Sequence, residues 1–143
     1  MFQNFGGTLT IKTLTSLNQF GFHVRGEGNL VMVSDCNFID NRGGSGNHSN
    51  GIEGRDGSVI EKWYFETGDD VIRVYYDLTV KNFTIKMLQN SVLIQLSWVK
   101  TGNDTGNFYN LTIIGNDGRG NNDNSFIVGW LRSYTKTISI YGC

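Results

Sequence analysis

Apolar residues recur along the chain in one spacing: an apolar residue, two others, a second apolar residue, one other, and a third. Successive copies begin 20 to 28 residues apart, and Ile11 with Leu14 extends the series toward the N-terminus. Repetition at such a period is typical of solenoids, in which each repeat stacks on the next. The copies are Val33-Cys36-Phe38, Ile60-Trp63-Phe65, Val80-Phe83-Ile85, Phe108-Leu111-Ile113 and a weaker Thr135-Ile138-Ile140.

A second set of apolar residues, spaced two apart, lies between these copies. Such alternation predicts half-buried strands, and no stretch of ten residues keeps the spacing of an amphipathic helix. Each period therefore carries at least two short strands, and the chain is predicted to be all-β. The alternating sets are Phe20-Phe22-Val24, Ile72-Val74, Val92-Ile94-Leu96 and Phe126-Val128.

A parallel β-helix of about five to six coils accounts for the long period better than an antiparallel sandwich, whose turns recur every 8 to 12 residues. Stacked coils align their inward residues, so Trp63 and the thiol of Cys36 are expected in the core. Asn82 and Asn110 each precede the second inward residue of a copy, a corner where Asn tolerates left-handed backbone. Residues 1–143 are expected to form a single domain, and because five or six coils are few for a solenoid, this domain is expected to be a fragment of a larger protein or to stack on other subunits.

Charge argues against a nucleic-acid partner, and the length of the apolar runs argues against a membrane. Twelve Lys and Arg against 13 Asp and Glu leave a net charge of −1 without a basic block, so nucleic acid is not expected. No apolar run approaches the length of a membrane helix, and a signal peptide is not present in this chain. The open ends of a short β-helix would expose strand edges, which can pair with the edges of another copy, so self-association through these ends is an expectation.

The candidate chemistry lies at Gly68-Asp69-Asp70, directly before the strand-like run that starts at Val71. Side chains of neighbouring extended residues diverge, so one carboxyl can face a leaving oxygen while the other reaches a water. Inverting glycosidases divide two carboxyls in this way. The alternative is that Gly-Asp-Asp forms a solvent-exposed turn without a catalytic role.

The surrounding residues favour a sugar site over a turn without function, because aromatic rings and long polar side chains stack and orient sugars. No metal or cofactor is expected, and His23 and His48, without ligand spacing, are expected at solvated loops or strand edges. The expected substrate-binding residues are Asn50, Glu53, Arg73, Tyr75, Tyr76, Gln95 and Trp98. Glu53 can equally be a surface carboxylate.

Several stretches together resemble glycoside hydrolase family 49, the dextranases and isopullulanase, which have a right-handed parallel β-helix. A more distant likeness to the polygalacturonases, with an Asp-Asp pair on the same fold, points to the same carbohydrate chemistry. The resemblance covers about residues 28 to 130 and is carried by Ser49-Asn50-Gly51-Ile52-Glu53, Gly57-Ser58-Val59-Ile60, Gly68 to Tyr76, Ser91 to Trp98 and Phe126-Ile127-Val128-Gly129.

The resemblance implies Asp69 as general acid and Asp70 as a base acting through water, in a secreted hydrolase of α-glucans. A third Asp of the family falls on Asn50, and an amide cannot accept a proton from water. Either Asp70 is the sole base, or hydrolysis is impaired and binding remains. The family's Lys is Arg73 here, which keeps the charge and changes the hydrogen-bond geometry. A catalytically silent polysaccharide-binding or self-assembling β-helix is the alternative.

Overall fold

The chain forms two sheets of parallel strands. The computed structural model describes residues 2–3, 5–26, 29–40, 42, 49–55, 57–88, 92–96, 105–115, 126–130 and 137–142, and these ranges contain strands and no helix. The six-stranded sheet comprises β1 (Phe2–Gln3), β4 (Phe22–Arg25), β6 (Asn50–Glu53), β8 (Ile72–Val74), β10 (Val92–Leu96) and β12 (Phe126–Trp130). The seven-stranded sheet comprises β2 (Thr8–Lys12), β3 (Thr15–Leu17), β5 (Leu30–Ile39), β7 (Ser58–Thr67), β9 (Leu78–Met87), β11 (Thr105–Ile114) and β13 (Thr137–Tyr141).

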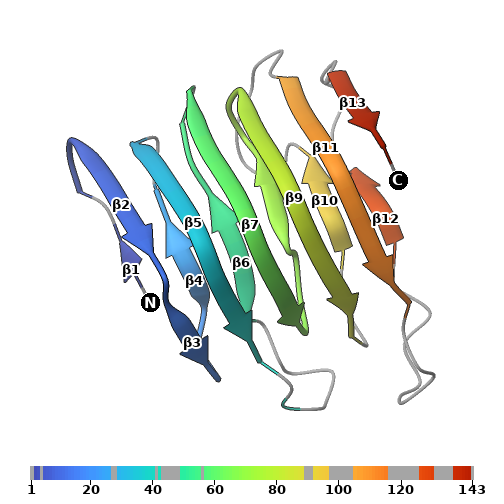
Figure 1. Cartoon of the computed structure of the whole chain (residues 1–143), viewed down its shortest axis with the longest axis horizontal. Helices are drawn as coiled ribbons and strands as arrows, with labels where there is room; N and C mark the ends of the chain where they lie inside the picture. The colour runs from blue at the N-terminus through green and yellow to red at the C-terminus, as the bar shows by residue number, and fades with distance from the viewer. Residues whose placement is uncertain are drawn as a thin grey trace.

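From β4 onward, successive strands alternate between the two sheets. Each strand pairs in parallel with the strand of the same sheet that comes two elements earlier or later. Figure 1 shows the long strands of the seven-stranded sheet in front of the shorter strands of the other sheet. The prediction of an all-β chain built from parallel strands is confirmed.

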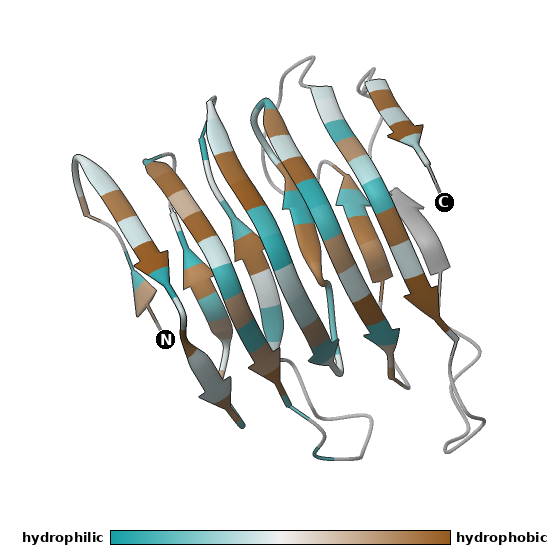
Figure 2. Ribbon diagram, viewed as in Figure 1, coloured by the Kyte–Doolittle hydropathy of each residue, from teal (hydrophilic) through white to brown (hydrophobic). Residues whose placement is uncertain are grey.

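The apolar repeat forms the core face of the seven-stranded sheet. Its first positions pair across β5, β7, β9 and β11, and the second and third positions pair in the same way. Trp63 stacks on Phe83 at a ring separation of 5.1 Å, as the core assignment of Trp63 predicted. Cys36 is a buried free thiol, also as predicted. Figure 2 shows the alternating hydrophobic and hydrophilic bands along these strands.

The last repeat has a different register from the one the sequence predicted. Ile138 pairs with Gly106 and Ile140 with Phe108, so Ile140 takes the first inward position and not the third. The prediction relied on Thr135 as a substitute for an apolar residue. The ladder of β11 instead places Thr137 opposite Thr105, and β13 covers only the first half of β11.

The long strands bend where one residue adopts left-handed backbone. Asn82 and Asn110 have φ values of 51° and 54°, which confirms the prediction for both. Asp35 and Lys62 occupy the equivalent positions before Cys36 and Trp63 and have φ values of 54° and 52°. The amide of Asn110 donates to Oδ1 of Asn82 at 2.7 Å, so the aligned corner also links neighbouring strands.

Replacing Lys62 with Asn is expected to stabilise the fold. An ordinary side chain in left-handed backbone costs roughly 1 kcal/mol, which Asn partly recovers through local hydrogen bonds. A gain of about 0.5 kcal/mol in the free energy of unfolding is expected in urea denaturation. Lys81→Asn, the same change in the extended part of β9, is the control and should bring no gain. Equal stability of Lys62→Asn and the wild type would contradict the strain argument.

The start of the six-stranded sheet departs from the simple alternation. Phe20 is 87% exposed, whereas the alternation assigned it to a strand with Phe22 and Val24. His23 is fully buried against the rings of Phe38 and Phe65, so the expectation of a solvated histidine is wrong for His23, whereas His48 lies outside the described residues. His23 and Val24 are consecutive residues of β4 and both are buried, so the alternation of buried and exposed side chains fails within this strand.

Burial shapes the chemistry of His23. Its Nδ1 lies 3.1 Å from Oγ of Ser16, and its Nε2 has no hydrogen-bond partner among the described residues. Desolvation lowers the pKa of His23 to about 4, although the charge of Asp40 acts in the opposite direction. The imidazole is therefore neutral at physiological pH and serves as part of the core.

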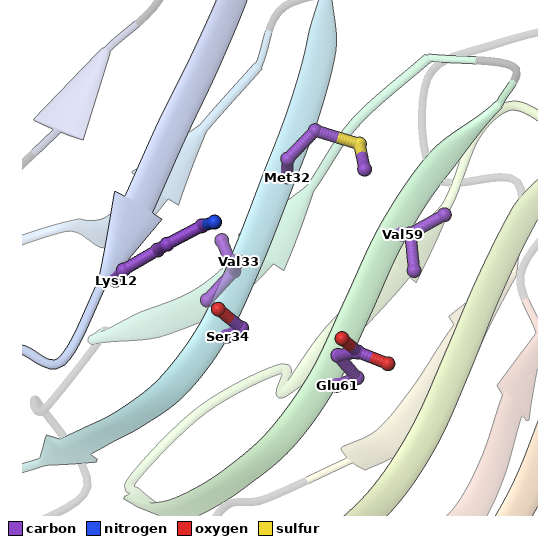
Figure 3. A pocket seen from close by; sticks show the side chains of 6 residues that line it. All are labelled: Lys12, Met32, Val33, Ser34, Val59 and Glu61. Carbon is purple, nitrogen blue, oxygen red and sulfur yellow. The ribbon is translucent and has the colours of Figure 1, made fainter.

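A small pocket opens on the seven-stranded sheet, away from the predicted sugar site. Figure 3 shows the side chains that line it, with Lys12 and Glu61 at its sides. None of the predicted site residues takes part in this pocket. The lining residues are Lys12, Met32, Val33, Ser34, Val59 and Glu61.

Among the described residues, no helix has the length and apolar character that a membrane crossing needs.

Candidate functional site

Parallel pairing of β6 with β8 brings Asn50 beside Asp70. Ile52 pairs with Ile72 and Glu53 with Arg73, so the register two residues earlier aligns Asn50 with Asp70. The amide N–H of Gly51 donates to the carbonyl oxygen of Asp70 at 2.7 Å, which ties the two positions together. Residues 20 positions apart in the sequence thus lie side by side.

A pair of hydroxyls fixes the turn that carries the two aspartates. Ser49 Oγ lies 3.0 Å from Thr67 Oγ1, and the Thr67 hydroxyl donates to the carbonyl oxygen of Ser49. The N–H of Gly68 also points to Ser49 Oγ, at 3.5 Å. Both side chains are buried, so this contact anchors the end of β7 to the start of β6. Together with the bond from the N–H of Gly51 to the carbonyl oxygen of Asp70, these contacts fix both ends of the turn at Gly68 to Asp70.

Arg73 links the carboxylate and the amide of the site. Its Nη2 lies 3.0 Å from Oδ2 of Asp70, and the same nitrogen donates to Oδ1 of Asn50 at 2.5 Å. The guanidinium also lies 4.7 Å from the centre of the Phe22 ring, within cation–π range. One side chain from β8 therefore gathers groups from β4, β6 and the turn before β8.

The two adjacent aspartates have different environments. Asp70 is 5% exposed, and burial raises its pKa to about 6 despite the opposing effect of Arg73; the charge of Asp69 raises it further. Asp69 is half-buried, and its Oδ1 accepts a hydrogen bond from the N–H of Asp70 at 2.8 Å. Carboxyls in unlike surroundings can take unlike roles in acid–base chemistry.

A row of charged and polar residues crosses the six-stranded sheet next to this cluster. Arg25 pairs with Glu53, Glu53 with Arg73, and Arg73 with Gln95 in the strand register. Glu53 is 6% exposed and lies 3.6 Å from Nε of Arg25, so it is a buried ion-pair partner and not a surface carboxylate. Positive and negative charges alternate from Arg25 through Glu53 to Arg73, an order that stabilises neighbouring strands because opposite charges face each other.

The other predicted contacts differ in exposure. Tyr75 is 6% exposed, and its hydroxyl has no hydrogen-bond partner among the described residues, whereas Tyr76 is half-buried. Burial raises the pKa of Tyr75 to about 12. Gln95 is 2% exposed and donates from Nε2 to the carbonyl oxygen of Leu96 at 3.2 Å. Tyr76 is the more accessible of the two tyrosines, and Trp98 lies outside the described residues.

The sequence did not assign Phe22, Arg25, Ser49 or Thr67 to the site. Phe22 was placed with the inward alternation, yet Arg73 covers its ring. The row at Arg25 could have been found by aligning β4 with β6, because Val24 and Ile52 share a register position. Ser49 directly precedes Asn50 and Thr67 directly precedes Gly68, so both are sequence neighbours of the predicted site residues.

Asp70 and His23 should affect stability in opposite directions over the same pH range. The folded-state pKa of His23 lies below its ordinary value of 6.5, so its stabilisation is lost as pH falls from 6.5 toward 4. The folded-state pKa of Asp70 lies above 3.8, so its stabilisation is present at low pH and lost as pH rises through about 6. In the wild type the two effects largely cancel.

Single replacements should uncover each effect. Asp70→Asn is expected to lose about 3 kcal/mol more stability than the wild type between pH 6.5 and 4, because the opposing contribution of Asp70 to that of His23 is then absent. His23→Leu should gain stability relative to the wild type over the same range. Urea denaturation at both pH values measures the difference. Identical pH profiles for Asp70→Asn and the wild type would contradict the buried, proton-binding state of Asp70.

Comparison with known proteins identifies distant partial relatives. The chain is similar to a dextranase of Arthrobacter sp. (strain CB-8), with 35% identity over 69 residues, which are 48% of this chain and 11% of that protein. A dextranase of Arthrobacter globiformis is 30% identical over the same shares. The chain therefore spans about a tenth of the length of these curated relatives. No family model and no solved structure matches the chain.

Proposed function

We propose that residues 1–143 form one right-handed parallel β-helix of about five to six coils. Support comes from the regular alternation of strands between two parallel sheets and from inward rows that keep one register over β5, β7, β9 and β11. The crossover rule for parallel strands favours the right-handed form. In this proposed fold, equivalent side chains of successive coils lie in a row with a spacing of about 4.8 Å, the distance between neighbouring strands.

The function that the site supports best is hydrolysis of an α-glucan such as dextran or pullulan, by an extracellular glycoside hydrolase of family 49 type. The single observation that carries it is the cluster in which Arg73 joins Asp70 to Asn50, beside a second, more accessible carboxyl on Asp69. The relatives named dextranase support the substrate class. No cofactor takes part in the proposed reaction.

In the proposed reaction, Asp69 protonates the glycosidic oxygen while Asp70 takes a proton from the attacking water. Asp69 is the more exposed of the two, so it is the carboxyl that a chain lying on the surface can reach. Asp70 is ionised above pH 6 and holds Arg73, which balances its charge. Asn50 orients the water or a sugar hydroxyl, and the bond is cleaved with inversion at the anomeric carbon.

The remaining predicted residues form the proposed binding surface. Tyr76 and Trp98 supply aromatic contacts, and the ring of Phe22, with Arg73 above it, extends that surface toward β4. Glu53 and Gln95 flank Arg73 in the register of the sheet, and the centre of the Tyr75 ring lies 6.0 Å from the Arg73 guanidinium. Their proposed role is to support the sugar contacts.

Incubation with dextran and pullulan tests the proposed activity. Measured reducing ends should rise with time for at least one glucan and should not rise with cellulose, whose β-linkages place the leaving oxygen on the other face of the sugar. Absence of release from both α-glucans would overturn the hydrolase assignment. Isothermal titration with the same α-glucans then separates an inactive binder from a protein without affinity for them.

A catalytically silent polysaccharide-binding or self-assembling module is the second candidate. It is favoured by one observation: the family's third carboxylate is absent at Asn50, and Arg73 occupies the facing oxygen of Asp70. Asn50→Asp discriminates the candidates. Turnover that appears only in Asn50→Asp would assign the natural chain to the binding class, whereas turnover already present in the wild type favours the hydrolase.

A further inference from the structure

Large apolar side chains are exposed only at the two ends of the stack of strands, as far as the described residues go. Phe2, Phe5, Leu17 and Phe20 belong to the layer that contains β1 to β4. Ile114, Ile140 and Tyr141 belong to β11 and β13 at the opposite end. Figure 1 places β1 and β2 at one end and β12 and β13 at the other. Exposed apolar groups gathered in this way mark an interaction surface.

The two end strands of the seven-stranded sheet match in length and register. β2 and β13 each have five residues, and the pairings through β5, β7, β9 and β11 align Thr8 with Thr137 and Lys12 with Tyr141. Among the described strands each of the two has one neighbour in the sheet, so each leaves an edge of backbone N–H and C=O groups. A parallel strand with the same inward spacing can pair with either edge.

We infer that the end at β13 binds the end at β2 of a second copy of this chain, which extends the parallel sheet from one molecule to the next. In that register Ile138 faces Leu9 of the neighbour, and Ile140 faces Ile11. Ile140 is 39% exposed and Leu9 is partly buried, so both gain cover. Phe2 of β1 takes the position next to Val128 of β12 in the other sheet.

A side-chain row on the outer face continues across the same junction. Tyr109 and Tyr141 stack at 4.8 Å, and Nζ of Lys81 lies 5.8 Å from the Tyr109 ring. The next position after Tyr141, in the neighbouring copy, is Lys12. The exposed face of Tyr141 would then meet a cation, as the far face of Tyr109 does within one molecule. The two ends are chemically unlike and fit each other.

Unlike ends that fit each other give a head-to-tail contact. Such a contact repeats from copy to copy and produces either an open filament or a closed ring. The mass measured by sedimentation velocity should therefore rise with concentration through multiples of the 16.0 kDa chain. Leu9→Lys blocks one end and Ile140→Lys the other, because each places a charge in the apolar junction. Each variant alone should stay monomeric, with the circular dichroism spectrum of the wild type.

Mixing the two variants is the decisive arm. Each retains one intact end, so the mixture should form a species of twice the chain mass and nothing larger. Thr84→Lys, at a half-buried position of β9 between β7 and β11, adds the same charge away from the ends and should assemble like the wild type. Lys12→Glu leaves both apolar rows intact and should weaken association about two- to fivefold.

A wild type that stays monomeric at all concentrations overturns the inference, and so does a single variant that still dimerises through like ends. Failure of this test leaves the proposed hydrolase function untouched, because Asp69 and Asp70 belong to neither end strand.

Discussion

The Gly51→Ala variant is expected to be largely unfolded at 25 °C. A β-carbon at Gly51 would lie 1.8 Å from the carbonyl oxygen of Val71 and 3.0 Å from Cε1 of Phe65. The first of these contacts is with backbone, which can move only if β6 separates from β8. The cost is expected to exceed about 4 kcal/mol, a large share of the stability of a small domain. Circular dichroism and urea denaturation measure the loss.

Gly115→Ala is the matched control for this prediction. No atom lies within 4 Å of a β-carbon built at Gly115, and its backbone is not left-handed, so its unfolding midpoint should remain close to that of the wild type. A Gly51→Ala protein with wild-type stability would mean that β6 and β8 are not as closely paired as their register requires. The position of Asn50 beside Asp70 would then be in doubt as well.

Asp69→Asn is expected to lower the hydrolysis rate on dextran or pullulan by about 10²- to 10⁴-fold. An amide of nearly the same shape cannot donate the proton that the leaving oxygen needs, and a positioned general acid contributes a factor of this size. Because Asp69 is half-buried and outside the strands, the folded structure should survive the change. Initial rates of reducing-end formation at saturating glucan measure the effect.

Asp35→Asn provides the matched control for the loss of activity. Asp35 is an exposed carboxylate at a left-handed corner of β5, where Asn is well tolerated. Its variant should hydrolyse glucan at the wild-type rate. Loss of activity in both variants would point to a general effect of charge, and retention in Asp69→Asn would remove Asp69 from the role of acid.

The apolar spacing predicted the long strands well because their inward residues repeat in one register. Val33, Ile60, Val80 and Phe108 form one continuous row, and Asn82 and Asn110 mark the bend in β9 and β11. The same reasoning failed for Phe20 and His23. Short strands of three to five residues lie between turns, and a turn shifts which side of the chain faces the core.

The candidate site was predictable as a group of residues and not as a set of contacts. Asp69, Asp70, Asn50 and Arg73 could be selected from a recognised motif. The bridge from Arg73 to Asn50 depends on the pairing of β6 with β8, which local sequence does not contain. The burial that raises the pKa of Asp70 likewise depends on the folded structure. Long-range register is the information that spacing alone could not supply.

The configuration of the first sugar product tests the central claim most directly. Proton NMR during hydrolysis of dextran by the wild type should detect the β-anomer of the new reducing end before mutarotation produces the α-anomer, because an inverting pair acts on an α-linkage. The signal should be absent with Asp69→Asn. Initial appearance of the α-anomer, or equal release by Asp69→Asn, would contradict the assignment of Asp69 and Asp70 as an inverting acid and base.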